Sequence, residues 1–242
     1  MGQYVRSLLF VLGQALSTLV FAPFCLVVFP LPFLWRYRFF TQWNRFNLWW
    51  LEMTCGIHYE VIGRENIPAT NAIVLCKHQS AWETLALPLC LPPLALVIKR
   101  ELLWIPLFGW GLALLEPIAI DRLASRKAIY QLLAQGRKRL EAGRWVVVFP
   151  EGTRVAVGSK GTYALGGALL AERTGCPVVP VAHNAGECWP RRQFLKRPGT
   201  IQLTFGPVIE STGKSAAEIN ALAESWIEKT VGEMSHQGAL CS

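Results

Sequence analysis

A histidine and an acid lie five residues apart in the segment K-H-Q-S-A-W-E at residues 77–83. A neutral imidazole can take a proton near pH 7, and a carboxylate on its other ring nitrogen holds the tautomer and stabilises the imidazolium. Five residues are about 500° of rotation on a regular helix, so His78 and Glu83 can meet only if His78 precedes a helix and Glu83 lies in its first turn. Ser80 as N-cap of that helix, with Glu83 at its third position, would give this placement. The pair is therefore either a base with its orienting acid or a capping box beside a loop histidine.

Two other segments carry groups suited to binding an anion. In F-P-E-G-T-R at residues 149–154, a glycine lets the backbone approach a ligand, a threonine offers a hydroxyl, and Arg154 offers a forked donor for phosphate oxygens. Lys99 and Arg122 each follow a predicted strand, and cations crowded together are favourable only when an anion joins them. They are candidate phosphate ligands, although either one could be an ordinary solvated charge. His183, in the polar turn after another apolar run, is interpreted as structural or substrate-lining.

From residue 57 onward, short β-rich runs alternate with helical stretches. This alternation predicts an α/β domain in which helices cover a largely buried sheet. Strands are predicted at residues 58–63, 72–76, 94–98, 117–120, 145–149, 178–182 and 201–205, and helices at 81–89, 125–142, 162–173 and 215–234. Binding sites of α/β proteins lie at the carboxyl ends of strands, and the E-G-T-R turn occupies such a position.

The N-terminal part of the chain has a different character. Residues 8–35 are almost uncharged and long enough to span a bilayer. Prolines interrupt the run at Pro23, Pro30 and Pro32. Because Arg6 and Arg36 place cytoplasmic-type charge on both flanks, a kinked hairpin in one leaflet is favoured, with a single span as the alternative. An amphipathic helix at 39–53 would lie at the membrane interface or pack on the core. The predicted organisation is anchoring helices over 1–56, an α/β domain over 57–235 and a flexible tail over 236–242.

Composition and net charge limit the kinds of partner and site that the chain could have. Hydrophobic residues make up 52% of the 242 residues, and 24 Lys and Arg against 16 Asp and Glu leave a net charge of +8. This charge is compatible with nucleic acid or an anionic membrane. The apolar N-terminus favours the membrane, and no nucleic-acid-binding motif appears, so nucleic acid is not expected as a partner. Seven cysteines without C-x-x-C spacing and four histidines without H-E-x-x-H predict neither a disulfide framework nor a metal site.

With these segments in view, the chain resembles the 1-acylglycerol-3-phosphate (lysophosphatidic acid) acyltransferases of the glycerolipid acyltransferase superfamily. The family's four blocks are matched, in order, by His78 to Glu83 for H-x4-D, by K-R-E-L at 99–102 with I-D-R at 120–122, by F-P-E-G-T-R at 149–154, and by V-P-V at 179–181. Their order and spacing agree across residues 59–205. The resemblance implies a mixed sheet flanked by helices.

The resemblance also implies a reaction. An acyl group would pass from a thioester, acyl-CoA or acyl carrier protein, to the sn-2 hydroxyl of 1-acyl-sn-glycerol 3-phosphate, making phosphatidic acid. His78 would remove the hydroxyl proton and Glu83 would hold the imidazole. The acceptor phosphate would be bound by Lys99, Arg122, Glu151, Gly152, Thr153 and Arg154, with Glu151 orienting Arg154. No cofactor is implied beyond the donor. The expected partners are the lysophospholipid, the donor and membrane lipids, at the cytoplasmic face of a bacterial inner membrane.

Three departures from the family pattern bear on substrate identity. Glu83 stands where Asp is commoner, Glu116-Pro117 replaces a frequent glycine before I-D-R, and Tyr163-Ala164 replaces an aromatic-Lys pair. The alternatives are therefore an acyltransferase for another lysolipid or an aminolipid, or a catalytically silent membrane-binding homologue. A serine hydrolase with Ser80 as nucleophile is disfavoured because no G-x-S-x-G elbow is present.

Overall fold

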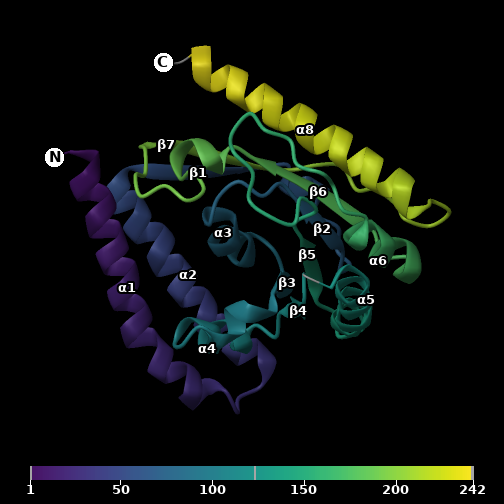
Figure 1. Cartoon of the computed structure of the whole chain (residues 1–242), viewed down its shortest axis with the longest axis horizontal. Coiled ribbons are helices and arrows are strands. Elements are labelled where there is room, and N and C mark those ends of the chain that lie inside the picture. The colour runs from purple at the N-terminus through teal and green to yellow at the C-terminus, as the bar shows by residue number, and fades with distance from the viewer. Residues whose placement is uncertain (1, 123, 241–242) are drawn as a thin grey trace.

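A mixed seven-stranded sheet in the order β1-β7-β6-β2-β5-β3-β4 forms the centre of the chain (Figure 1). The computed structural model describes residues 2–122 and 124–240. The strands are β1 (Ile57–Ile62), β2 (Ile73–Cys76), β3 (Leu94–Lys99), β4 (Ile118–Ile120), β5 (Trp145–Val148), β6 (Val178–His183) and β7 (Gly199–Phe205). Neighbouring strands are parallel except β6 and β7, which are antiparallel. Every predicted strand is present, with ends shifted by at most two residues, and the predicted mixed sheet is confirmed.

The central strands are buried on both faces. Every residue of β2 and β5 is buried, as expected for parallel strands covered by helices on each side. Their side chains alternate between two apolar clusters, with Val74 and Cys76 in one, and Ile73 and Leu75 in the other. Because β6, β2, β5, β3 and β4 run in the same direction, their carboxyl ends meet at one edge of the sheet. The predicted site residues follow these ends.

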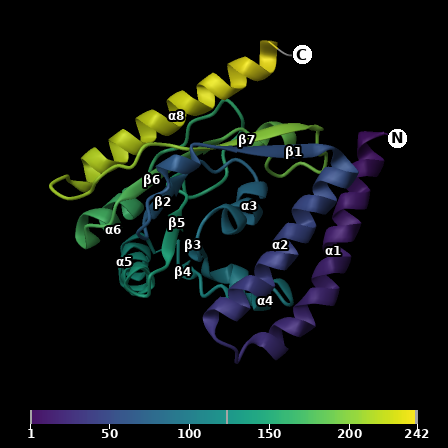
Figure 2. The same ribbon diagram turned by 180° about the vertical axis from the view of Figure 1, so that it is seen from behind.

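Helices cover the two faces of the sheet (Figures 1 and 2). The helices after the N-terminal pair are α3 (Trp82–Cys90), α4 (Phe108–Leu114), α5 (Ser125–Glu141), α6 (Gly166–Thr174), α7 (Ala185–Cys188) and α8 (Ala216–Leu240), with short 3-10 helices η1 (Arg64–Asn66) and η2 (Arg100–Trp104). Helices α5, α6 and α8 contribute to one apolar cluster and α3 to the other. The sheet and its helices therefore form three layers.

The helices differ from the prediction in several places, and the helix predicted over 39–53 begins six residues earlier, at Phe33. Helix α6 begins at Gly166 rather than Thr162, because Ala164 N donates to Pro150 O and holds the preceding segment against the turn after β5. Helix α8 continues to Leu240, through part of the predicted flexible tail, since no proline stops it there. Helices α4 and α7 were not predicted, because both are too short to show a 3.6-residue period.

Within residues 2–56, helices α1 (Gln3–Val28) and α2 (Phe33–Cys55) form an antiparallel hairpin. Pro23 lies within α1, and the chain reverses at residues 29–32, so only the later prolines mark the break. Contacts along the whole pair join the helices: Trp50 Nε1 donates to Leu9 O (3.1 Å), Trp43 Nε1 donates to Ser17 Oγ (3.2 Å), and Phe21 stacks on Phe39 (4.2 Å). By length and composition, α1 could cross a membrane.

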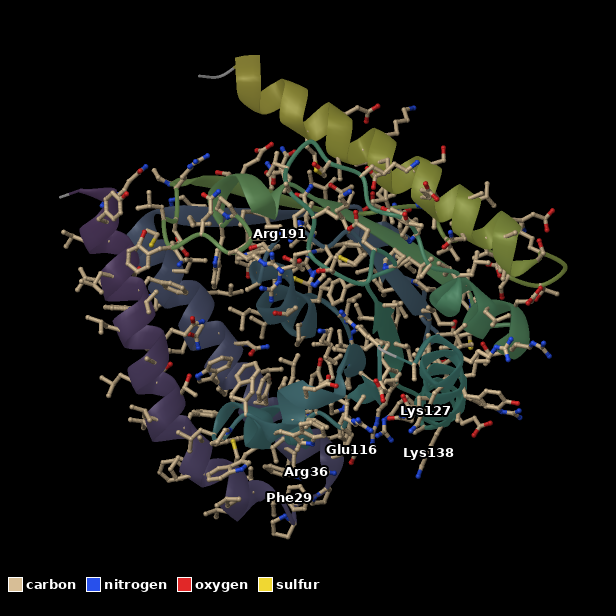
Figure 3. All side chains as sticks on the ribbon, viewed as in Figure 1. Phe29, Arg36, Glu116, Lys127, Lys138 and Arg191 are labelled. Atoms are coloured by element: carbon tan, nitrogen blue, oxygen red, sulfur yellow. The ribbon has the colours of Figure 1, made fainter. Side chains whose placement is uncertain are left out.

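Glu116 connects this hairpin to the sheet. It precedes β4 with φ of 46°, a conformation that suits the glycine frequent at this position. Its carboxylate accepts a hydrogen bond from Arg36 of α2 (Figure 3). It also accepts one from Arg144 (2.7 Å), and Arg139 Nη1 lies 3.3 Å away. The departure from glycine therefore comes with three arginine contacts that stabilise the strained residue and link α2 to α5 and β4.

The close approach of α1 to α2 at Gly13 gives a test of the hairpin. A Cβ at Gly13 would lie 2.0 Å from Trp50 Nε1, so Trp50 would have to move and lose its bond to Leu9 O. We expect Gly13→Ala to lower the free energy of unfolding by about 1–3 kcal/mol, measured by thermal unfolding in detergent. The control is Gly232→Ala on α8, where a Cβ meets nothing within 4 Å, and we expect a gain of up to about 1 kcal/mol. Equal stability of the two variants would contradict the hairpin packing.

Candidate active site

His78 and Glu83 form the predicted dyad at the carboxyl edge of the sheet. His78 follows β2, and its Nδ1 lies 2.7 Å from Glu83 Oε1 in the first turn of α3. The imidazole stacks on Phe149, with ring centroids 4.2 Å apart, and the Glu83 side chain is fully buried. Since an ionised carboxylate only accepts, Nδ1 carries the proton and Nε2 is left as the acceptor. The dyad thus presents a neutral imidazole nitrogen to the pocket described below.

One half of the predicted capping box, the bond from Ser80 N to the Glu83 carboxylate, is present and places the acid. Glu83 Oε1 accepts the backbone N–H groups of Ser80 (3.0 Å) and Gln79 (3.2 Å), and Ser80 Oγ accepts from Trp82 N (3.2 Å). The helix begins at Trp82 with Ala81 as its N-cap, one residue later than predicted for Ser80. The two interpretations of the sequence are therefore compatible, because the same carboxylate oxygen caps the turn and holds His78.

A second histidine lies behind the acid. His183, at the end of β6, is fully buried, and its Nε2 lies 3.8 Å from Glu83 Oε2, an oxygen without a hydrogen-bond partner among the described residues. His183 Nε2 donates to Lys77 O (2.8 Å), and its Nδ1 accepts from Ala185 N (3.2 Å), so the ring is held as the neutral tautomer. Burial lowers the pKa of His183 below its ordinary value, despite the nearby Glu83. The structural role predicted for His183 fits this position.

The charge state of Glu83 follows from opposing effects. Burial alone would raise the pKa of the Glu83 carboxyl, but the two neighbouring histidines and the Ser80 amide outweigh burial, and the pKa stays below its ordinary value. Glu83 is therefore ionised at neutral pH. An ionised acid stabilises positive charge on His78 when that ring takes a proton.

Glu151 of the F-P-E-G-T-R turn supports the dyad rather than a ligand. Its carboxylate accepts from Lys77 Nζ (2.8 Å), from the backbone N–H of His78 (2.9 Å) and from Gly161 N (3.3 Å). The prediction that Glu151 orients Arg154 and binds substrate is therefore corrected. The physical reason is the alternation after β2, which directs Lys77 to the α8 face and leaves a buried ammonium group that must be neutralised.

Lys77 and Glu151 belong to a larger buried network. Lys77 Nζ also donates to Glu228 Oε1 of α8 (2.8 Å) and to Ser159 O (3.2 Å), and Tyr163 OH donates to the same Glu228 oxygen (2.7 Å). Ala164 stands where the family pattern has a lysine, so the cation expected there is missing. The hydroxyl of its neighbour Tyr163 joins this network and contributes no positive charge to the site.

A cationic pocket with a volume of about 270 Å³ opens beside His78. It brings together the predicted Lys99, Arg122, Thr153 and Arg154, and adds Arg191 and Arg192 from the loop between α7 and β7. Arg191 is labelled in Figure 3. Gly152, with φ of 65°, does not line the pocket directly; its carbonyl accepts from Arg122 and holds that side chain in place. Among the described residues, none of the five cations lies within 4.0 Å of a carboxylate. The pocket is built to receive an anion.

Arg191 and Arg192 were missed from the sequence. They follow β6 in the segment W-P-R-R, and a pair of arginines just after the V-P-V strand was the available signal. The loop has no periodicity, and Arg192 adopts φ of 56°, so its direction could not be predicted from local pattern.

An apolar pocket of about 520 Å³ adjoins the cationic one. Thr84 and Arg154 line both pockets, and the apolar lining comes from α1, α3 and α4, including Val11, Leu85 and Phe108. The described residues contain no group of three or more His, Cys, Asp or Glu that could hold a metal ion. The site therefore combines a base, an anion pocket and an apolar pocket, an arrangement that fits a molecule with an anionic head and a hydrocarbon chain.

Comparisons with known proteins agree with this arrangement. Residues 58–184 match the sequence family described as Acyltransferase. The chain is 47% identical, over 96% of its length and 93% of the relative's, to the 1-acyl-sn-glycerol-3-phosphate acyltransferase of Pseudomonas aeruginosa. It is 32% identical, over 70% of its length and 61% of the relative's, to 1-acyl-sn-glycerol-3-phosphate acyltransferase alpha of Mus musculus. Its fold is similar to the crystal structure of the 1-acyl-sn-glycerophosphate (LPA) acyltransferase PlsC from Thermotoga maritima, with a TM-score of 0.79, 24% identity, and coverage of 97% of this chain and 98% of the other.

Lys77 supplies the ammonium group of the buried network, so we expect its removal to lower the stability of the fold strongly. Lys77→Met leaves two carboxylates without their shared cation, and we expect it to lower the free energy of unfolding by about 3–5 kcal/mol, measured by urea unfolding in detergent. Adding Glu151→Gln to this variant should recover part of the loss. The matched control is Lys229→Met, which removes an exposed pair with Glu233 and should change the midpoint little. A small effect of Lys77→Met would contradict the network.

His183 predicts a pH dependence of stability. In the unfolded chain its imidazole protonates near pH 6.5, whereas in the folded protein its pKa is lower, so below pH 6.5 the unfolded state binds more protons. The wild type should therefore lose stability as pH falls from 7 to 5. His183→Gln should weaken this slope in thermal unfolding, because the titrating group is gone. His58→Gln, at an exposed histidine, should retain the wild-type slope. An unchanged slope in His183→Gln would contradict burial of a neutral ring.

Proposed function

The chain belongs to the acyltransferase family, and from that premise we propose that it transfers an acyl group from acyl-CoA or acyl carrier protein to the sn-2 hydroxyl of 1-acyl-sn-glycerol 3-phosphate. The product is phosphatidic acid. The similarity to a named 1-acyl-sn-glycerol-3-phosphate acyltransferase over 96% of the chain supports this assignment. The observation that carries it is the position of His78, which lines the same pocket as five cations without carboxylate partners among the described residues.

The dyad supplies the base. The hydroxyl oxygen of the acceptor attacks the thioester carbonyl carbon, and His78 Nε2 takes the hydroxyl proton as the C–O bond forms. Nδ1–H stays on Glu83, whose negative charge stabilises the imidazolium. The tetrahedral intermediate then collapses, the C–S bond breaks, and the leaving thiolate receives the proton from His78. No covalent enzyme intermediate is required, because the thioester is already activated.

The cationic pocket supplies position. Lys99, Arg122 and Arg154 line it together with His78, so a phosphate bound there would place its lipid's hydroxyl close to Nε2. A fixed arrangement of the two reacting groups replaces a bimolecular encounter, which accounts for a large share of the rate enhancement in such reactions. The acyl chain of the acceptor would lie in the adjoining apolar pocket between α1, α3 and α4.

The helical hairpin is proposed to lie in one leaflet at the cytoplasmic face. Ser7 and Cys25, near the two ends of α1, are both buried, so α1 packs against the rest of the protein along its length. If α1 crossed the bilayer, the α/β domain beside it would be carried into the hydrocarbon. Helix α1 exposes large apolar residues, among them Leu12, Leu16, Leu19, Val20, Phe24 and Val27. This surface suits insertion parallel to the membrane.

Acyl transfer by purified variants tests the assignment. With palmitoyl-CoA and lysophosphatidic acid, we expect His78→Ala to lower kcat by about 10²–10⁴-fold, because the base is lost. Arg154→Ala should raise the KM for lysophosphatidic acid about tenfold or more with a smaller change in kcat, because a charge-assisted hydrogen bond to phosphate is lost. Arg173→Ala, at an exposed arginine of α6 that lines neither pocket, should behave as wild type.

Three outcomes would contradict the proposal. Equal use of a phosphate-free acceptor such as monoacylglycerol, or an unchanged acceptor KM in Arg154→Ala, would remove the phosphate-binding role and favour another lysolipid or an aminolipid acceptor. Absence of thioester-dependent acylation of every acceptor by the wild type would favour a catalytically silent membrane-binding homologue.

A further inference from the structure

A second polar pocket, with a volume of about 250 Å³, adjoins the cationic pocket. Arg191 lines both pockets, and Gln79, which lines the second, directly follows His78. The remaining lining includes Val155, Val157, Glu187 and Arg197. Val155 N donates to His78 O (2.8 Å), so the wall of the second pocket is attached to the loop that carries the base. A molecule in this pocket would meet the cationic pocket at Arg191, whereas the apolar pocket meets it at Thr84 and Arg154.

A buried carboxamide lines this second pocket. Gln79 is 2% exposed, and its Oε1 has no hydrogen-bond partner among the described residues. Leaving a buried acceptor unpaired costs about 1–3 kcal/mol. Gly186 makes room beside it, since a Cβ there would lie 3.2 Å from Gln79 Oε1 and 2.9 Å from Val157 Cγ2. The carboxamide oxygen is therefore placed to accept a hydrogen bond from an N–H group of a ligand.

The positive charge around the two pockets exceeds what one phosphate monoester needs. Five cations line the first pocket, and Arg197 joins Arg191 in the second. Within the described part of the chain, neither Arg191 nor Arg197 lies within 4.0 Å of a carboxylate. One carboxylate, Glu187, also lines the second pocket, so six cations and one carboxylate line the two pockets together. This positive charge exceeds the two charges at most on the acceptor phosphate and leaves room for a second anionic group. Coulomb repulsion between neighbouring cations is relieved when that group binds.

We infer that the second pocket binds the phosphopantetheine arm of the acyl-thioester donor, with an amide N–H of the arm on Gln79 Oε1 and its phosphate on Arg197. This inference rests on the proposed acyl transfer. The arm is a linear chain with the thioester at one end, two amide groups along it and a phosphate at the other end. The amide groups of the arm match the buried acceptor Gln79 Oε1, its carbon chain matches the valines, and its phosphate matches the arginines. Arg191, at the junction, contacts the anions of both substrates. Because acyl-CoA and acyl carrier protein share this arm, one pocket serves both donors.

Separate KM values for donor and acceptor test this inference. We expect Arg197→Ala to raise the KM for palmitoyl-CoA and for palmitoyl-acyl carrier protein by a similar factor of about ten, and to leave the KM for lysophosphatidic acid within about twofold. Gln79→Met, which keeps the shape of the side chain, should raise the donor KM about threefold or more. Arg197→Lys should fall between wild type and Arg197→Ala, and Arg173→Ala should match wild type. With palmitoyl-pantetheine, which lacks the phosphate, Arg197→Ala should have no more than about a twofold effect.

The outcomes separate this inference from the proposed function. A rise in the lysophosphatidic acid KM without a change in the donor KM would overturn the inference, and so would an effect of Arg197→Ala confined to palmitoyl-CoA, since that would place the nucleotide rather than the shared arm on Arg197. Unchanged donor KM values in both Arg197→Ala and Gln79→Met, with normal turnover, would overturn the inference alone. If the wild type transfers no acyl group from either donor, the proposed function itself fails.

Discussion

A buried ion pair between Lys77 and Glu151 joins the carboxyl ends of the two central strands, β2 and β5. Neither side chain is exposed, so each charge depends on the other for its stability. The remaining carboxylate oxygen of Glu151 accepts the backbone N–H of His78, and Glu228 of α8 completes the neutralisation of Lys77. The position of the catalytic loop therefore depends on a long-range contact, and the F-P-E-G-T-R turn supports the base as well as lining the pocket.

Glu83 is likewise a buried charge that is held by its hydrogen-bond partners, which explains how a glutamate serves in the dyad. Its carboxylate accepts two backbone amides at the start of α3 and the Nδ1–H of His78, so the longer side chain is held by the turn that it caps. The second oxygen faces His183, which its hydrogen bonds to Lys77 O and Ala185 N keep neutral. A charged His183 would compete with His78 for the acid. Burial thus assigns different roles to two histidines around one carboxylate.

The parallel strands bring the chemistry to one edge, and the hairpin gives that edge an apolar side. The cationic pocket lies at the strand ends, whereas the adjoining apolar pocket is partly built by α1. Glu116 holds α2 against β4 and α5 through three arginines, so ion pairs link the hairpin to the sheet. An amphipathic substrate requires a cationic and an apolar pocket next to each other. The residues that build the two pockets are far apart in the sequence, and the packing of the hairpin on the sheet brings them together.

The sequence by itself determined the seven strands, the dyad, and the gathering of Lys99, Arg122, Thr153 and Arg154 around His78. The strands follow from local pattern, because apolar runs predict buried strands, and parallel strands place the residues that follow them at one edge. The roles of the dyad and of the pocket residues came from the resemblance to the acyltransferase blocks, because the residues alone also allowed a capping box and solvated charges. Only the tertiary structure decided that Glu151 binds Lys77, that Glu116 adopts a glycine-like conformation, and that Arg191 and Arg192 reach the pocket. Those contacts join residues far apart in the chain, and they depend on strand order and on side-chain direction, which no local periodicity encodes.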